Sequence, residues 1–314
     1  MNVIETNKLS KTYGKRRGVE NISLEVKEGE IYGFVGPNGA GKSTTIRLLL
    51  NFIYPVSGSG KIFNKDIVKE SKEIKKLIGY VPSEVRFYDD MKVKEIIEYA
   101  CSFYEKVNMD EIYTLCDVFE MDLHKKMREL SLGNKKKVAI VQALVNNPKL
   151  IILDEPTGGL DPLMQKKLFD TLKALRKRGT TIFLSSHNLM EVENLCQRVA
   201  VIKEGKIIDI IEIEKERENS GHKIIIKGEK IDELLIKNIG GKEVNNLQGN
   251  ISFMYYDDIN KLIKELSNYK INKLLISEKT LEDKFMKYYL WRREVWIYLN
   301  MNLRNCLSQW LYGQ

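Results

Sequence analysis

The chain has 314 residues, of which 43% are hydrophobic and 30% charged, with a formal net charge of +8. This composition is typical of a soluble globular protein with one large or two ordinary domains. There is no run of about eighteen apolar residues, which excludes a segment that spans a membrane alone, and the N-terminus lacks an apolar stretch of signal-peptide type. The four scattered cysteines form no Cys-x-x-Cys pair and are typical of reduced cytosolic thiols.

A basic balance is compatible with binding to nucleic acid, binding to an anionic membrane surface, or simple solubility. The basic residues are spread along the chain, and runs such as Lys135–Lys137 are short. We therefore interpret most of the positive charge as solvated surface.

A glycine-rich loop lies between a predicted strand, Ile31–Val35, and a predicted helix, Thr44–Leu50. The loop matches the phosphate-binding pattern G-x-x-x-x-G-K-[ST] through residues Gly36, Pro37, Asn38, Gly39, Ala40, Gly41, Lys42, Ser43 and Thr44. Its glycines let backbone N–H groups converge on phosphate oxygens, and the helix N-terminus adds a partial positive charge. We expect Lys42 to contact the β- and γ-phosphates of a nucleotide and the Ser43 hydroxyl to contact Mg²⁺.

The segment 85–149 differs from its surroundings because it holds three helix-like stretches and no convincing strand. These stretches are Val93–Tyr104, Met109–Glu120 and Leu132–Asn146. Residues 1–84 and 150–210 instead alternate strand-like and helix-like segments, the pattern of an α/β domain with a mostly parallel sheet. The sequence therefore predicts an α/β domain over 1–215 with a helical subdomain at about 85–149.

A predicted buried strand, Leu150–Leu153, ends in two carboxylates, Asp154 and Glu155. An aspartate at the end of such a strand can hold Mg²⁺, usually through water. The adjacent Glu155 is suited to orient or deprotonate an attacking water. These carboxylates narrow the choice among GTPases, kinases and ATPases that the phosphate loop leaves open.

Beyond residue 210 the composition changes. Lys215–Gly221 is polar and charged, as in a linker. The next segment contains strand-like and helix-like stretches, which are Lys223–Lys227, Ile231–Asn238, Ile251–Tyr255, Ile259–Leu266 and Leu274–Ser277. We predict a small α+β accessory domain over 222–289. For the aromatic and basic tail 290–314 we consider an interfacial or partner-binding helix, a helix packed on the accessory domain, and a non-native extension.

Three further motifs complete a set that is typical of one family. Residues 130–134 (Leu-Ser-Leu-Gly-Asn) open a predicted helix, residues 159–162 (Gly-Leu-Asp-Pro) follow the carboxylate strand, and His187 follows the next predicted strand. With this order and spacing, residues 1 to about 212 resemble the nucleotide-binding subunit of an ATP-binding-cassette (ABC) transporter. The resemblance implies a P-loop NTPase domain of the ABC type, with a mixed sheet and a helical insert, that binds ATP and Mg²⁺ and hydrolyses ATP.

The resemblance also implies roles for residues around one nucleotide. Residues 36–44 would form the Walker A loop, with Asp154 as the Walker B aspartate and Glu155 as the catalytic glutamate. His187 matches the switch histidine that contacts the γ-phosphate in the family. Tyr13 lies where the family stacks an aromatic ring on adenine.

Other residues are implied to act across a dimer. Ser131 and Gly133 match the signature motif, which in the family binds the γ-phosphate held by the other subunit. Asp161 matches the D-loop, which crosses the dimer interface. The resemblance therefore implies a homodimer or pseudo-dimer of ATPase subunits in which each chain supplies half of a site.

The chain departs from the family pattern at two places. Leu132 and Asn134 stand where the signature motif usually has glycine and glutamine. Ser83 stands at the position of a glutamine that normally approaches Mg²⁺ and links the nucleotide to the membrane partner. Ser83 is shorter, so Glu84 or a water could replace its metal contact, or the shape of the loop alone could provide the coupling.

At these positions the sequence resembles one branch of the family, the exporters whose ATPase pairs with separate type-2 membrane subunits. Bacitracin-type ATPases belong to this branch. The resemblance implies a motor subunit that dimerises on ATP and drives export through a separate integral-membrane permease. We expect a cytoplasmic location at the inner face of the plasma membrane, reached through the permease, and no nucleic-acid partner. The alternatives are a single-cassette ATPase with a soluble or regulatory role, including a nucleic-acid- or ribosome-associated one, and a module that has lost hydrolysis.

Overall fold

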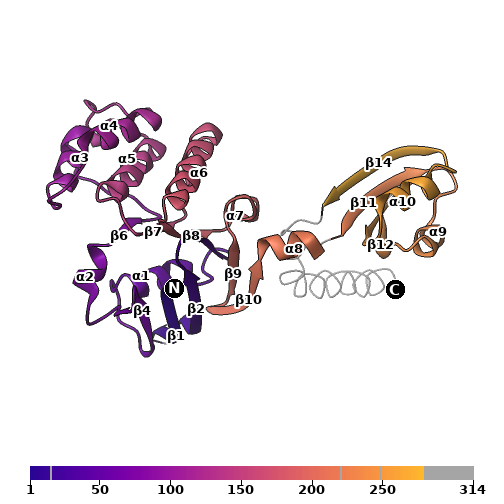
Figure 1. The fold of residues 1–314 in the computed structure, drawn as a ribbon, viewed down its shortest axis with the longest axis horizontal. Helices are drawn as coiled ribbons and strands as arrows, with labels where there is room; N and C mark the ends of the chain where they lie inside the picture. The colour runs from indigo at the N-terminus through magenta and orange to yellow at the C-terminus, as the bar shows by residue number, and fades with distance from the viewer. Residues whose placement is uncertain (15, 220, 248, 279–314) are drawn as a thin grey trace, which may run out of the picture. The chain divides into compact units, whose positions relative to one another are not determined.

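The computed structural model describes residues 1–278 except 15, 220 and 248 (Figure 1). Contacts divide the chain into two compact units, Met1–Ile213 and Glu214–Gln314. The tail 290–314 and the last residues of the predicted accessory domain lie outside the described residues. Within the part of the chain that is described, no helix combines the length and apolar character needed to cross a membrane.

The first unit is built on a six-stranded sheet with the order β10-β9-β3-β8-β7-β6. Its strands are β3 Ile31–Val35, β6 Ile78–Val81, β7 Leu150–Asp154, β8 Thr181–Ser186, β9 Arg198–Lys203 and β10 Lys206–Glu212. Neighbouring strands are parallel except for β10, which runs antiparallel to β9. The sheet is therefore mixed, as predicted. Because β3, β7 and β8 are parallel neighbours, the residues that follow them meet at one edge of the sheet.

A second, antiparallel sheet of the same unit has the order β2-β1-β4-β5. Its strands are β1 Asn2–Tyr13, β2 Arg16–Lys27, β4 Ser57–Ile62 and β5 Lys65–Asp66. Buried side chains of β1, β2 and β4 share one apolar cluster with residues of β3, β8 and helix α1 (Lys42–Leu49), including Phe34 and Phe183. This core fixes the start of α1 between the two sheets. The sequence does not predict this second sheet, although Ile22, Leu24 and Val26 alternate with more polar residues.

The other helices of the first unit are α2 Ser71–Lys75, α3 Val93–Cys101, α4 Met109–Val118, α5 Leu132–Leu144, α6 Pro162–Lys177 and α7 Leu189–Leu195. Helices α3 and α4 each contact α5, which in turn contacts the edge strand β6 (Figure 1). They are the three helices predicted for the insert, each ending a few residues early. Glu120 and Asn147 adopt positive φ angles just beyond α4 and α5, a conformation that ends a helix.

The second unit has an antiparallel sheet with the order β12-β13-β11-β14. Its elements are α8 Ile213–Asn219, β11 His222–Gly228, α9 Glu233–Asn238, β12 Lys242–Leu247, β13 Asn250–Tyr255, α10 Ile259–Leu266 and β14 Ile271–Glu278. Ile224, Ile236, Phe253 and Leu262 lie in its core. The unit has the predicted α+β character. Most of the segment interpreted as a linker, Lys215–Gly221, forms α8, whose Glu, Lys and Arg residues favour a helix.

Candidate active site

The glycine-rich loop connects β3 to α1 in a shape that only glycine allows. Gly39 and Gly41 have φ angles of +80° and +112°, which residues with a Cβ rarely adopt. A Cβ on Gly36 would lie 2.3 Å from the Ile202 carbonyl oxygen. Among the described residues, no side chain caps the N-terminus of α1. The first N–H groups of this helix are therefore suited to bind an anion by donating hydrogen bonds to it.

Lys42, the first residue of α1, folds back onto the loop that precedes it. Its Nζ donates hydrogen bonds to the carbonyl oxygens of Gly36 at 2.7 Å and Pro37 at 3.2 Å. It also forms an ion pair with Glu155 Oε1 at 3.1 Å. The side chain is buried, so the charge lies in a medium where electrostatic interactions are stronger than in water.

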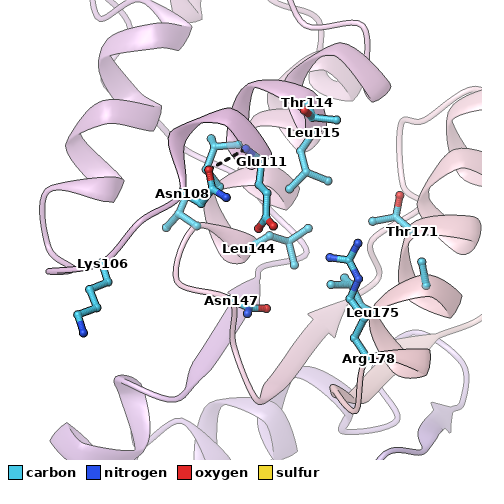
Figure 2. A pocket seen from close by; sticks show the side chains of 13 residues that line it. Lys106, Asn108, Glu111, Thr114, Leu115, Leu144, Asn147, Thr171, Leu175 and Arg178 are labelled. Atoms are coloured by element: carbon cyan, nitrogen blue, oxygen red, sulfur yellow. Dashed lines mark hydrogen bonds between the residues drawn. The ribbon is translucent and has the colours of Figure 1, made fainter.

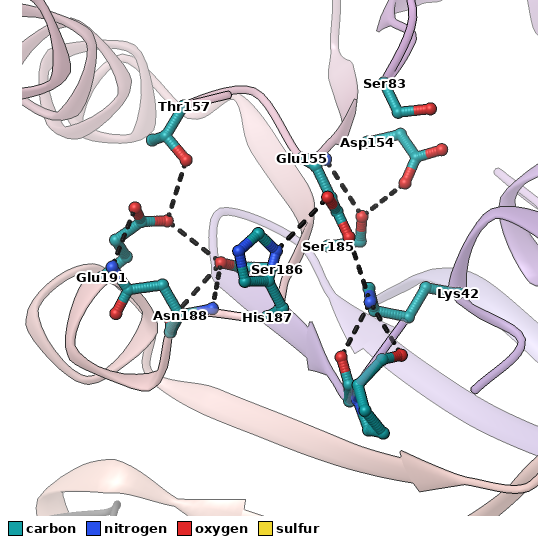
Figure 3. A network of polar contacts seen from close by, with 12 residues as sticks. Lys42, Ser83, Asp154, Glu155, Thr157, Ser185, Ser186, His187, Asn188 and Glu191 are labelled. Atoms are coloured by element: carbon teal, nitrogen blue, oxygen red, sulfur yellow. Dashed lines mark hydrogen bonds and ion pairs between the residues drawn. The ribbon is translucent and has the colours of Figure 1, made fainter. Parts of the chain in front are cut away.

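The two carboxylates at the end of β7 have different environments (Figure 3). Asp154 is 2% exposed, and its Oδ1 accepts a hydrogen bond of 2.6 Å from the Ser185 hydroxyl of the adjacent strand. Glu155 adopts a φ of +48°, and its carboxylate lies between the Lys42 ammonium group and the His187 imidazole. Oε1 contacts Lys42, and Oε2 lies 3.3 Å from His187 Nδ1. The structure thus brings together residues that are more than a hundred positions apart in sequence.

A cavity of about 490 Å³ opens beside this cluster. It is lined by Tyr13, Gly18, Asn38, Gly39, Gly41, Lys42, Ser43, Thr44, Ser83, Glu84 and Glu155. Four separate segments therefore converge on the phosphate loop: the end of β1, the start of β2, the loop after β6 and the end of β7. The partly exposed ring of Tyr13 contributes an aromatic surface to the cavity wall.

The remaining predicted residues lie outside that lining. Ser131 is the N-cap of α5, and its hydroxyl accepts a hydrogen bond of 3.3 Å from the Asn134 N–H. A Cβ on Gly133 would lie 2.2 Å from the Gly159 carbonyl oxygen, so the start of α5 packs directly on the loop after β7. Asp161 is the N-cap of α6. Ser131 and Asp161 are both exposed.

Lys136 on α5 is a site residue that the sequence does not predict. Its run of lysines is interpreted above as solvated surface, but the residue is 1% exposed. Its Nζ donates to the carbonyl oxygens of Ser83 at 2.7 Å, Pro82 at 2.9 Å and Glu155 at 3.3 Å. Burial lowers the pKa of Lys136, although the nearby Asp154 and Glu155 carboxylates act in the opposite direction. Pro82 and Ser83 lie more than fifty residues from Lys136 in the sequence, and Glu155 lies 19 residues away, so no local pattern indicates these contacts.

A second unpredicted feature is the buried carboxylate of Glu191 on α7 (Figure 3). Its Oε2 accepts hydrogen bonds from Thr157 Oγ1 at 3.1 Å and Ser186 Oγ at 3.0 Å. Its Oε1 accepts one from Asn188 Nδ2 at 3.2 Å. Thr157 follows the carboxylates of β7, while Ser186 and Asn188 flank His187. Glu191 therefore joins the two loops that surround Glu155.

Another cavity, of about 440 Å³, lies among α4, the end of α5 and α6. Figure 2 shows Glu111 and Arg178 with their charged ends directed into the space between these helices, beside Leu144 and Leu175. None of the predicted site residues lines it. The phosphate-loop cavity is therefore the candidate active site.

Comparison with known proteins identifies the family. The family model described as "ABC transporter" matches residues 19–158, and a model described as "AAA domain, putative AbiEii toxin, Type IV TA system" matches residues 125–193. The bacitracin transport ATP-binding protein BcrA of Bacillus licheniformis is 36% identical over 299 residues, which cover 91% of this chain and 96% of that protein. This chain belongs to the ABC transporter ATP-binding proteins.

Further relatives of this ABC protein agree with the assignment. The linearmycin resistance ATP-binding protein LnrL of Bacillus subtilis (strain 168) is 34% identical, with 66% of this chain and 68% of that protein covered. A solved ATP-binding subunit of an ABC transporter superposes with a TM-score of 0.63 at 28% identity, covering 69% of this chain and 92% of that one. A dimeric ATP-binding cassette bound to ADP and Pi superposes with a TM-score of 0.61 at 25% identity, covering 67% and 98%. The predictions of an ABC-type fold and of an ATPase are confirmed.

Proposed function

We propose that this ABC ATPase is the motor subunit of an exporter, which dimerises on ATP and drives a separate integral-membrane permease. The division of its site residues carries the proposal. Lys42 and Glu155 line the phosphate-loop cavity and His187 contacts Glu155, whereas Ser131 caps α5 outside the lining of that cavity. One chain then supplies half of each of two sites. The bacitracin transport and linearmycin resistance functions of two relatives support export.

Each residue at the site would contact a different part of the bound nucleotide or its metal ion. The Tyr13 ring would stack on adenine, and the N–H groups at the start of α1 would hold the phosphates together with Lys42. Ser43 and Asp154 offer the oxygen ligands that Mg²⁺ prefers. The hydrogen bond from Ser185 orients the Asp154 carboxylate for this role. Ser83, which also lines the cavity, is a further candidate ligand. Bound Mg²⁺ would neutralise charge on the phosphates.

Glu155 is proposed as the general base. Its carboxylate is held at hydrogen-bond distance from Lys42 and His187. When Lys42 turns to a phosphate, Oε1 becomes able to accept a proton from the attacking water. His187, whose Nδ1 lies 3.3 Å from Oε2, would keep the carboxylate in place.

The proposed organisation places the ATPase domain at 1–215, with its helical subdomain at 85–149, and the accessory domain at 222–289. The chain would be cytoplasmic and held at the inner face of the plasma membrane through its permease. The two ATPase subunits would be copies of this chain or this chain and a close relative.

Mixed dimers test the composite site. Two differently tagged chains are co-purified, one carrying Lys42→Ala and the other Ser131→Arg. If Lys42 of one subunit and Ser131 of the other share a site, both changes damage the same site and the second site stays intact. The mixed dimer should then keep about half of the wild-type ATP turnover if the two sites act independently.

The matched control carries both substitutions on one chain and pairs it with a wild-type chain. This arrangement damages each site once, so turnover should be nearly lost. Equal turnover of the two mixed dimers would contradict the composite site.

A further inference from the structure

One ammonium group joins three parts of the active site. Lys136 Nζ donates to the carbonyl oxygens of Pro82 and Ser83 in the loop after β6, and to that of Glu155 after β7. Lys136 itself lies on α5, one turn after the signature residues. An ammonium group has three N–H donors. The three carbonyl oxygens therefore match its full donor capacity in a place where the side chain is almost completely buried.

All three contacts are made to the main chain. Holding a carbonyl oxygen fixes the peptide plane to which it belongs, so Lys136 constrains the backbone on both sides of the cavity. Glu155 needs such a constraint, because its φ of +48° is a conformation that residues with a Cβ seldom adopt. In that conformation its carboxylate reaches both Lys42 and His187.

The loop after β6 contributes Ser83 both to the cavity and to the contacts of Lys136. Ser83 lines the cavity together with Glu155. Its carbonyl oxygen accepts the shortest of the three hydrogen bonds from Lys136. A backbone connection through Lys136 therefore runs between this loop and the proposed base.

We propose that Lys136 is a positioning residue for ATP hydrolysis, which holds Glu155 in its productive orientation and ties that orientation to the loop Pro82–Glu84. The proposal rests on the role of Glu155 as general base. A movement of the loop would then reach Glu155 through a single side chain. Lys136 contacts neither the phosphate loop nor its lysine in the described structure, so its effect falls on the catalytic step rather than on ATP binding.

The first test is Lys136→Met, which keeps the length of the side chain and removes its donors. We expect kcat for ATP to fall by about 10–100-fold, because a displacement of about 1 Å in a reacting group has an effect of this size. KM should change by less than about two-fold. Lys173→Met on α6, an exposed lysine, is the charge-matched control and should keep wild-type kinetics. An unchanged kcat in Lys136→Met would overturn the proposal.

A double-mutant cycle tests whether Lys136 acts through Glu155. In the Glu155→Gln background, single-turnover hydrolysis should fall by less than about two-fold when Lys136→Met is added, because the group being positioned is already disabled. A full second loss of about 10–100-fold would show an independent effect and overturn the proposal. Wild-type turnover by Glu155→Gln alone would instead contradict the proposed base, which separates the two failures.

Amide hydrogen exchange on the intact protein tests whether the loss of Lys136 affects only the two loops that it contacts or the structure as a whole. In Lys136→Met, exchange should increase at residues 82–86 and 155–158, while α1 keeps its protection. If Lys136→Met does not fold, Lys136→Arg decides the question. The planar guanidinium keeps the charge but cannot direct three donors as an ammonium does, so kcat should fall with KM unchanged. Wild-type kcat in Lys136→Arg would then overturn the proposal.

Discussion

The two helix N-termini that carry the glycine-rich loop and the signature motif are built in opposite ways. Helix α1 begins directly after Gly41, a residue whose backbone has a left-handed conformation. No described side chain caps this end of the helix. Helix α5 begins at the N-cap Ser131, whose own hydroxyl accepts a hydrogen bond from the Asn134 N–H. Both ends have the partial positive charge of a helix N-terminus. Only the start of α1 leaves its N–H groups without a side-chain cap.

This difference suggests different roles for the two helix ends: the start of α1 would bind phosphates, and the start of α5 would complete the site of a second subunit. The open end of α1 lies in a cavity with Glu155 and can take phosphates within its own chain. The end of α5 is capped within the single chain by Ser131, which is exposed, as suits a surface that would meet a second copy. Each prediction below tests one side of this comparison.

The largest effect is expected from Glu155→Gln, at the α1 side. The amide cannot accept the proton of the attacking water, so hydrolysis should fall by roughly 10²–10⁴-fold. ATP should still bind, because the loop and Lys42 are intact. Turnover is measured with excess ATP, and binding by titration with a fluorescent ATP analogue. Near-wild-type turnover would show that the chemistry does not depend on this carboxylate.

The next effect is expected from Gly133→Ala, at the α5 side. The new Cβ would lie 2.2 Å from the Gly159 carbonyl oxygen, and its three nearest atoms all belong to the backbone. We expect the free energy of unfolding to fall by about 1–3 kcal/mol, as for overpacked cores. The matched control is Gly158→Ala, whose Cβ would meet its nearest neighbour at 3.6 Å and should change stability by less than about 0.5 kcal/mol. Urea titration of both variants provides the measurement, and equal stabilities would refute the close contact.

The smallest effect is expected from Ser131→Ala. Loss of an N-cap hydroxyl should lower the free energy of unfolding by about 1 kcal/mol, whereas Ser131→Gly should cost only a few tenths. Urea titrations of the two variants provide the measurement. Equal losses in the two variants would show that the hydroxyl does not cap α5 in solution.

The arrangement of the glycine-rich loop and the side chains beside it could largely be predicted from the sequence. The phosphate-loop pattern fixes the residue types that the loop needs, and the apolar runs on either side of it lie at β3 and α1. The order of β3, β7 and β8 in a parallel sheet then brings Asp154, Glu155 and His187 close to Lys42. Local chemistry and one topological rule are sufficient for this result.

The contacts that hold the site in place could not be predicted. Lys136 and Glu191 are charged residues in polar segments, and each has a partner more than thirty residues away, Pro82 for Lys136 and Thr157 for Glu191. A pattern of neighbouring residues contains no information about such partners. The antiparallel sheet is different, because the alternation at Ile22, Leu24 and Val26 is a local signal. Helix α8 is similar, since its charged residues favour helix as well as linker.

The ion pair between Lys42 and Glu155 has a consequence for affinity. In the proposed mechanism the same ammonium group serves the Glu155 carboxylate and a phosphate of the nucleotide, so the two anions would compete for it. If Lys42 turns to the phosphate, the Glu155 carboxylate would be released at that moment to act on water. Arrival of the substrate would then release the proposed base from the lysine with which it is otherwise paired.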